Sequence, residues 1–183
     1  MRRLSLFAVR SLALAALAGL TLIDVSPVMA QGAANKGASG LPLPRFVSLK
    51  ATRVNLRIGP GRDYAVAWLY TKSGVPMEVV QEYDNWRRVR DAEGTEGWVY
   101  QSLLSGKRTA MAAPWKRGVS QNDLINMRRE SRANARVVAR LEPGVVVKVK
   151  ACDGDWCEAE ADGASGYVAQ SEIWGAYPGE AFK

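Results

Sequence analysis

The side chains best able to do chemistry in this chain are aromatic rings, arginines, one cysteine pair and a short acidic cluster. Histidine is absent from all 183 residues, which removes the commonest general base and metal ligand near neutral pH. Two cysteines without histidine cannot complete a zinc site of Cys and His ligands within one chain. We therefore expect a non-enzymatic protein that binds a partner and needs no cofactor.

The acidic cluster is the one feature that suggests catalysis, because glycosidases cleave sugars with a pair of Asp or Glu residues. Its members are Asp153, Asp155, Glu158, Glu160 and Asp162. They fall on a predicted turn and an exposed strand, without the apolar pocket that raises the pKa of a catalytic acid. We expect a solvated surface here, and a hydrolase of unfamiliar type is the weaker alternative.

The two cysteines, Cys152 and Cys157, flank a predicted turn. Opposite positions of a hairpin bring Cβ atoms to within about 5 Å, close enough for a disulfide. If Val147 and Val149 face the core, strand alternation turns Cys152 away from it. Comparison with the inward Val89 of the other copy turns Cys157 towards the core, so a bulge at the turn is needed to bring the two cysteines together. We expect the disulfide. A redox-active pair is disfavoured, because such motifs usually place two residues between the cysteines, and four stand here.

Residues 1–30 have the order of a signal peptide. Arginines at positions 2, 3 and 10 precede an uncharged apolar run, and small residues precede a cut between Ala30 and Gln31. The run ends at Asp24, short of the ~20 residues that span a membrane. We expect export to the periplasm or the medium, with no membrane span after cleavage and no nucleic-acid partner.

Composition divides the remaining chain. Residues 31–44 are rich in Gly, Ala, Ser and Pro and predict a flexible lead-in. A similar stretch predicts a linker at 107–114, and residues 177–183 a tail. The predicted domains are therefore 45–106 and 115–176, a workable size for small barrels. Without residues 1–30 the chain keeps 22 basic and 17 acidic residues, a net charge of +5.

The two domain segments repeat four landmarks in the same order, at offsets of 69 to 71 residues. These are Val54–Arg57 with Ile125–Arg128, Gly74 with Gly144, 84–86 with 154–156, and 97–102 with 166–171. Ordered landmarks at a near-constant offset indicate an internal duplication. Each copy has short strand-like runs between Gly-containing turns, which predicts an all-β fold, and a barrel would remove exposed sheet edges.

The landmarks resemble the bacterial Src-homology-3 (SH3) domain family over roughly residues 45–175. Copy one carries Asn55-Leu56-Arg57, Gly59-Pro60, Gly74, Trp86 and Gly97-Trp98-Val99. Copy two carries Asn126-Met127-Arg128, Gly144, Trp156 and Gly166-Tyr167-Val168, with Arg129-Glu130 in place of Gly-Pro. The resemblance implies two tandem SH3-like small β-barrels and a binding or scaffolding role in the cell envelope. Such domains often accompany cell-wall hydrolases, but no hydrolase segment is present between residues 45 and 183.

Aromatic residues are the best binding candidates, because flat rings offer contact area at a low cost in entropy. We nominate Tyr64, Trp86, Trp98, Tyr100, Trp156, Tyr167 and Trp174. Alternation from an inward Val89 predicts that Trp86 faces outward. The alternative is that the rings cap the barrel ends or are covered by a loop or the other barrel.

Arginines accompany the aromatic residues in copy one, at positions 57, 62, 87, 88 and 90. Guanidinium groups suit carboxylates, so Arg88 joins the candidate binding residues; a solvated strand face is the alternative. The leading hypothesis is recognition of a peptidoglycan peptide or an envelope protein. The second is a structural, self-associating envelope protein whose aromatic residues pack between barrels. The sequence leaves the oligomeric state open.

Overall fold

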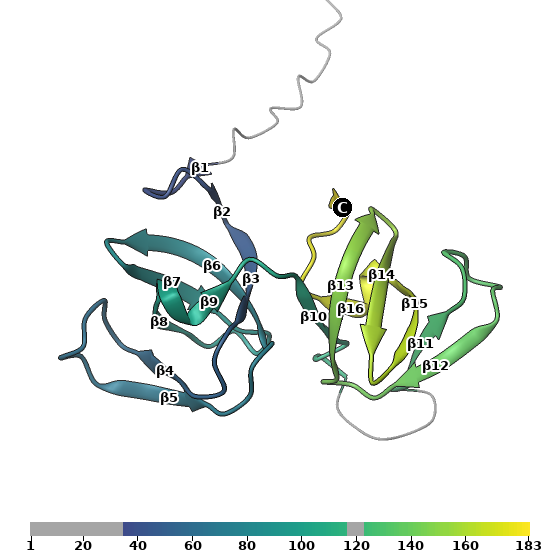
Figure 1. The fold of residues 1–183 in the computed structure, drawn as a ribbon, viewed down its shortest axis with the longest axis horizontal. Helices are drawn as coiled ribbons and strands as arrows, with labels where there is room; N and C mark the ends of the chain where they lie inside the picture. The colour runs from purple at the N-terminus through teal and green to yellow at the C-terminus, as the bar shows by residue number, and fades with distance from the viewer. Residues whose placement is uncertain (1–34, 117–122) are drawn as a thin grey trace, which may run out of the picture. The chain divides into compact units, whose positions relative to one another are not determined.

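The computed structural model describes residues 35–116 and 123–183, and these form β-strands joined by short turns (Figure 1). The expected signal peptide and its cut between Ala30 and Gln31 lie outside the described residues. Among the described residues, no helix is long and apolar enough to span a bilayer.

The first barrel is one curved antiparallel sheet. Its strands are β3 (Arg45–Leu49), β4 (Val54–Arg57), β5 (Val66–Tyr70), β6 (Pro76–Tyr83), β7 (Trp86–Arg90), β8 (Glu96–Tyr100) and β9 (Leu104–Ser105). They are ordered β5-β4-β8-β7-β6-β3-β9. A short 3₁₀ helix, η1 (Gln101–Leu103), connects β8 to β9.

The second barrel repeats this arrangement strand for strand. Its strands are β10 (Thr109–Ala112), β11 (Ile125–Arg128), β12 (Val137–Leu141), β13 (Val146–Asp153), β14 (Trp156–Ala161), β15 (Ala164–Ala169) and β16 (Ile173–Trp174). Their order is β12-β11-β15-β14-β13-β10-β16, and β17 (Ala181–Phe182) adds a pairing to β13. The matching order confirms the predicted all-β fold with two tandem SH3-like barrels.

Each barrel has its own apolar core at equivalent positions. The fully buried pairs are Val54 and Ile125, Leu56 and Met127, Met77 and Val147, Val89 and Ala159, and Val99 and Val168. Gly97 and Gly166 are equivalent too, and each allows a close approach. A Cβ on Gly97 would lie 2.5 Å from Leu56, and one on Gly166 2.5 Å from the Arg128 carbonyl.

A bulge in the longest strand of each barrel, β6 and β13, decides which side chains face inward beyond it. The register shifts between Val79 and Gln81 in β6, and between Val149 and Ala151 in β13. One extra residue reverses the alternation that follows. Cys152 is therefore buried directly opposite Cys157, and the predicted disulfide is confirmed with an S–S distance of 1.95 Å.

The bulge gives the first barrel a different brace at the same place. Glu82 stands directly opposite Arg87, the two positions that Cys152 and Cys157 occupy in the second barrel. The Glu82 carboxylate lies 3.3 Å from the Arg87 guanidinium, and its side chain is only 1% exposed. A buried ion pair thus takes the place of the disulfide.

The predicted linker at 107–114 and the predicted tail at 177–183 both contain strands. β10 is the first strand of the second barrel and pairs with β13 and β16. Its composition resembles that of a linker because two of its four residues are alanine, and the fold needs a small residue at Ala110. A Cβ on Gly175 would lie 2.8 Å from the Cβ of Ala110.

The predicted lead-in differs from the structure over its described part, residues 35–44. β1 (Asn35–Lys36) and β2 (Pro42–Leu43) form a small hairpin. The Ser39 amide and hydroxyl each donate a 2.7 Å hydrogen bond to the Glu82 carboxylate. The hairpin is therefore attached to the first barrel by the same carboxylate that pairs with Arg87.

Candidate functional site

An aromatic pair lies on the outer face of the first barrel. Trp86 on β7 and Tyr100 on β8 stand directly opposite each other, with ring centroids 5.4 Å apart at an interplanar angle of 83°. Val89 is fully buried, so Trp86 faces outward as alternation predicts. It is half-buried rather than exposed, because the Tyr100 ring covers part of it.

Beside this pair lies a cavity of about 420 Å³, here called the groove. Its lining is Arg53, Asn55, Arg57, Arg62, Trp86, Tyr100, Ser102 and Leu103. Residues 53, 55 and 57 line it because Val54 and Leu56, between them, point into the core. Sequence reasoning missed Arg53 and Asn55, although the same alternation could have found them.

The groove is positively charged. Three guanidinium groups line it, and no carboxylate does. Within residues 35–116 and 123–183, no carboxylate forms an ion pair with Arg53, Arg57 or Arg62. Arg57 donates a 2.6 Å hydrogen bond to the Tyr64 carbonyl, as Arg128 does to the Ala135 carbonyl at 2.8 Å in the second barrel. Arg57 thus braces a loop, which leaves Arg53 and Arg62 as the groove's unengaged cations.

A second aromatic contact adjoins the groove on the same sheet face. Trp98 stands opposite both Arg57 and Arg88 in register, and its ring centroid is 6.4 Å from that of Tyr83. Arg88 pairs with Glu96 at 2.8 Å. Tyr83 is 60% exposed and was not predicted; the register that places it opposite Trp86 depends on the bulge.

Tyr64 lies outside the groove lining, in the loop that Arg57 braces, and is 48% exposed. Two of the predicted arginines are engaged elsewhere. Arg87 is buried beside Glu82, and Arg90 lies 2.6 Å from the carboxylate of Glu78. These two guanidinium groups brace the barrel and do not line the groove.

The Glu82 carboxylate is strongly held in its ionised form. Burial favours the neutral acid, but hydrogen bonds from Ser39 and Arg45 and the charge of Arg87 outweigh burial and lower the pKa of Glu82 to about 2. A carboxylate that stays charged at all ordinary pH values is a structural anchor. It cannot serve as a general acid.

The second barrel has lost the chemistry of the groove. Ala169 stands opposite Trp156, where the first barrel has Tyr100 opposite Trp86. Glu158 stands opposite Tyr167, where the first barrel has Arg88 opposite Trp98. The duplication places Ala133 at the position of Arg62 and Ala135 at that of Tyr64. Tyr167 keeps Arg128 opposite it, as Trp98 has Arg57, but Trp156 has no aromatic residue opposite it and Tyr167 no second arginine.

Trp174 takes part in packing between the two barrels. Its ring meets that of Phe46 edge to face, with centroids 5.0 Å apart. Tyr177 lies on the same Phe46 ring at 4.7 Å, and its hydroxyl donates a 2.9 Å hydrogen bond to Glu78. Burial and the Glu78 carboxylate raise the pKa of Tyr177, so its hydroxyl stays protonated. Trp174, a candidate binding residue, therefore contributes to packing within the chain.

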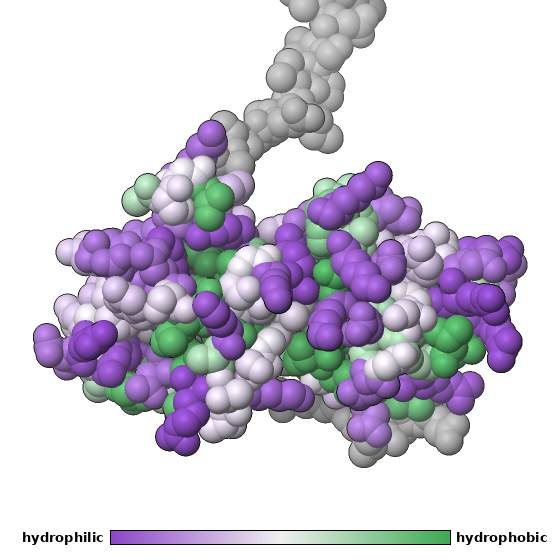
Figure 2. Space-filling model, viewed as in Figure 1, coloured by the Kyte–Doolittle hydropathy of each residue, from purple (hydrophilic) through white to green (hydrophobic). Residues whose placement is uncertain are grey.

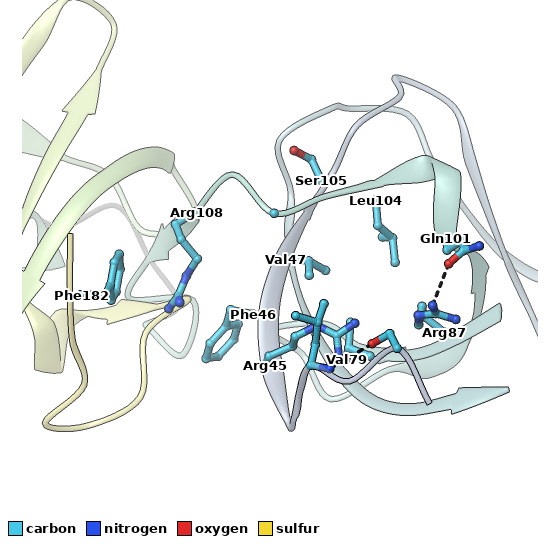
Figure 3. A pocket seen from close by; sticks show the side chains of 13 residues that line it. Arg45, Phe46, Val47, Val79, Arg87, Gln101, Leu104, Ser105, Arg108 and Phe182 are labelled. Atoms are coloured by element: carbon cyan, nitrogen blue, oxygen red, sulfur yellow. Dashed lines mark hydrogen bonds between the residues drawn. The ribbon is translucent and has the colours of Figure 1, made fainter. Parts of the chain in front are cut away.

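A larger cavity, about 520 Å³, lies beside this contact. Figure 3 shows Phe46, Arg108 and Phe182 along it, with the Arg108 guanidinium 5.7 Å and 4.1 Å from the two ring centroids. Its guanidinium groups are already engaged, since Arg108 binds Glu180 at 2.9 Å and Arg87 donates to Gln101 at 2.7 Å, although the Nε of Arg108 has no hydrogen-bond partner among the described residues. It offers a ligand fewer unengaged polar groups than the groove does.

The acidic cluster has no catalytic geometry. Hydrogen bonds from the backbone of Trp156 and Asp155 lower the pKa of Asp153, whereas a general acid needs a raised one. Glu158 and Glu160 pair with Lys150 at 3.7 Å on the surface. Among the described residues, no group of three or more Cys, Asp or Glu side chains is placed to hold a metal ion.

Comparison with known proteins gives the following matches. The family model of the bacterial SH3 domain matches residues 50–106 and 121–175. Two similar solved structures are NlpC2 and NlpC1 from Trichomonas vaginalis, each 12% identical, with TM-scores of 0.31 and 0.32. The matches cover 72% and 75% of this chain and 48% of each of those chains, so the chain spans about half their length. No curated protein matches the chain.

Proposed function

Because the chain belongs to the bacterial SH3 domain family, whose members are generally binding modules, we propose that it binds an acidic extended peptide in the groove of its first barrel. The observation that carries this proposal is the groove itself. It combines an aromatic pair with three arginines and lacks any carboxylate in its lining.

Binding in the groove is an equilibrium process without a covalent step. The rings of Trp86 and Tyr100 supply apolar area against the peptide backbone and side chains. Arg53 and Arg62 bind carboxylates, because a guanidinium group can donate two parallel hydrogen bonds to one carboxylate. The ligand class is a peptidoglycan peptide or an acidic segment of an envelope protein. The signal-peptide pattern of residues 1–30 supports export to the periplasm or the medium, where both ligands occur.

The polar surface also favours selective binding over general adhesion. On the face drawn in Figure 2, hydrophilic residues cover most of the described surface and apolar residues appear as scattered patches. The structural alternative, self-association through aromatic residues, is supported only by Trp174, which packs within the chain. The rings of Trp86 and Tyr100 contact each other and line the groove.

The test measures the affinity of the purified protein for acidic peptides, including peptidoglycan stem peptides, by calorimetry. Arg53→Gln and Arg62→Gln should each weaken binding about tenfold, the lower end for a hydrogen bond to a charged group. Amidating the ligand carboxylates should weaken binding to the same extent. Arg129→Gln is the matched control, since Arg129 is an exposed arginine of the second barrel at the position of Ile58.

Equal losses in the groove variants and in Arg129→Gln would mean that only net charge matters, and the proposal would be wrong. A pull-down on purified sacculi and on envelope extract separates the two ligand sources. Recovery of neither at physiological salt also contradicts the proposal.

A further inference from the structure

A second positively charged cavity lies where the two barrels meet, and it shares no lining residue with the groove. Its volume is about 620 Å³. Among its lining residues are Lys50, Ser73, Ser105, Lys107, Thr109 and Lys148, and we call it the lysine pocket. Both barrels contribute to it, since Lys50 and Ser73 belong to the first and Lys148 to the second.

The lysine pocket is lined by cations and hydroxyl groups. Four of its side chains are cationic and none is a carboxylate. Arg108 is engaged by Glu180, and Lys148 lies 3.6 Å from Glu160 with a side chain that is 75% exposed. Lys50 and Lys107 form no ion pair with any residue that the structure describes. Two of the four cations, Lys50 and Lys107, are therefore without a counter-ion among the described residues.

A buried hydroxyl group without a partner points to a ligand at this place. Thr109 is only 7% exposed, and its Oγ1 has no hydrogen-bond partner among the described residues. Such a group destabilises a folded protein. The fold does not need a hydroxyl group here. Thr109 stands opposite Lys148 in the second barrel, and Phe46 stands at the equivalent position, opposite Glu78, in the first. The duplicated position accepts an apolar side chain.

We propose that the lysine pocket binds a phosphate group, with the Thr109 hydroxyl and the Lys50 and Lys107 ammonium groups as donors. Lysine is a compact point charge that binds phosphate, whereas carboxylates are better matched by the planar fork of arginine. The one arginine here is already paired with Glu180. The phosphate pocket and the carboxylate groove are thus chemically distinct sites.

A neighbouring cavity of about 550 Å³ shares Ser73, Thr109 and Lys148 with the lysine pocket and adds Lys72, but the carboxylates of Glu160 and Asp162 also line it. These carboxylates repel a phosphate, so the proposed site is confined to the lysine pocket, where no carboxylate lines the cavity. A ligand held by residues of both barrels stabilises their contact, because it binds the folded chain and not the unfolded one.

The experiment titrates the purified protein with inorganic phosphate and tripolyphosphate and follows its melting temperature and heat of binding. Citrate serves as the carboxylate probe. Vesicles of phosphatidylcholine with and without phosphatidylglycerol show whether a lipid headgroup is the source. Tripolyphosphate should raise the melting temperature more than citrate at equal charge. Binding to soluble phosphates alone, or also to the phosphatidylglycerol vesicles, supports the pocket; binding to neither overturns it.

Two variants make the proposal specific. Lys107→Gln and Thr109→Val should each raise the dissociation constant for tripolyphosphate at least fivefold. Lys150→Gln, on the same β13 strand as Lys148 but outside the pocket, should leave it unchanged. Without ligand, Thr109→Val should melt at the same or a higher temperature, since it removes an unpartnered hydroxyl. A lower melting temperature for Thr109→Val, or equal losses in Lys150→Gln, overturns the proposal.

Discussion

The disulfide between Cys152 and Cys157 gives a prediction whose size follows from the structure. The two residues are five positions apart and directly opposite in the β13–β14 hairpin. Closing a loop of about six residues lowers the entropy of the unfolded chain enough to stabilise the fold by about 2 kcal/mol. Reduction keeps both side chains, although the two sulfur atoms must move apart, so it should cost about this amount.

Replacing both cysteines with alanine should cost more than reduction does. Cys152 is 6% exposed and Cys157 fully buried, so the alanines also remove two packed sulfur atoms from the second core. Each buried group of that size contributes about 0.8 kcal/mol, which brings the expected loss for the double variant to roughly 3–4 kcal/mol. The difference between the two treatments separates cross-linking from packing.

Urea unfolding followed by circular dichroism measures both losses, and thermal melting adds the size of the cooperative unit. If both barrels unfold together, about 2 kcal/mol lowers the melting temperature by about 4–8 °C; if the second barrel unfolds alone, by about 8–16 °C. A loss below about 0.5 kcal/mol on reduction would refute the loop-entropy reasoning. The first barrel is an internal control, because Glu82 and Arg87 occupy its equivalent positions.

Three further predictions concern the same braces and the contact between the barrels. The folded-state pKa of Glu82, about 2, lies below its usual 4.5. The ionised carboxylate therefore stabilises the folded state by about 3 kcal/mol above pH 4.5, and this stabilisation is lost as the pH falls towards 2. Acid unfolding should show this loss, and Glu82→Gln should be less stable at pH 7 with a flatter acid limb; an unchanged limb contradicts the anchor role. Phe46→Ala should cost about 3 kcal/mol and split unfolding into two steps in calorimetry, whereas the exposed Tyr83→Ala should cost under about 0.5 kcal/mol; a single unchanged transition for Phe46→Ala rules out coupling through this ring. The double variant Glu82→Cys with Arg87→Cys should form a disulfide under oxidising conditions, because its positions match those of the natural bridge, and free thiols on titration would count against that match.

Much of the fold was predictable because its signals are local. The landmarks around Trp86 and Trp156 mark turns and strands within a few residues, and their repetition predicts the two matching barrels. Alternation from Val89 also places Trp86 on the outer face. β10 was missed because strands of small residues resemble linkers in composition, and only packing against Gly175 distinguishes the two.

The candidate site was predictable in part. Trp86 and Tyr100 line the groove, and their role in binding stays a prediction, whereas Trp174 packs on Phe46. Arg87, one of the arginines noted beside the aromatic residues, is buried beside Glu82. Arginines that the sequence does not distinguish differ in whether a carboxylate of the protein already engages them. Which of them meets a carboxylate depends on strand register, and one bulge in β6 changes that register.

The sequence by itself determined the duplication, the two all-β barrels that follow from it and the pairing of the only two cysteines, because these depend on patterns within each copy. Tertiary structure alone decided which cations stay unpaired and where the lysine pocket forms. Lys50 and Lys148 line one cavity although almost a hundred residues separate them. Long-range Coulomb and packing contacts of that kind leave no periodic trace in the chain.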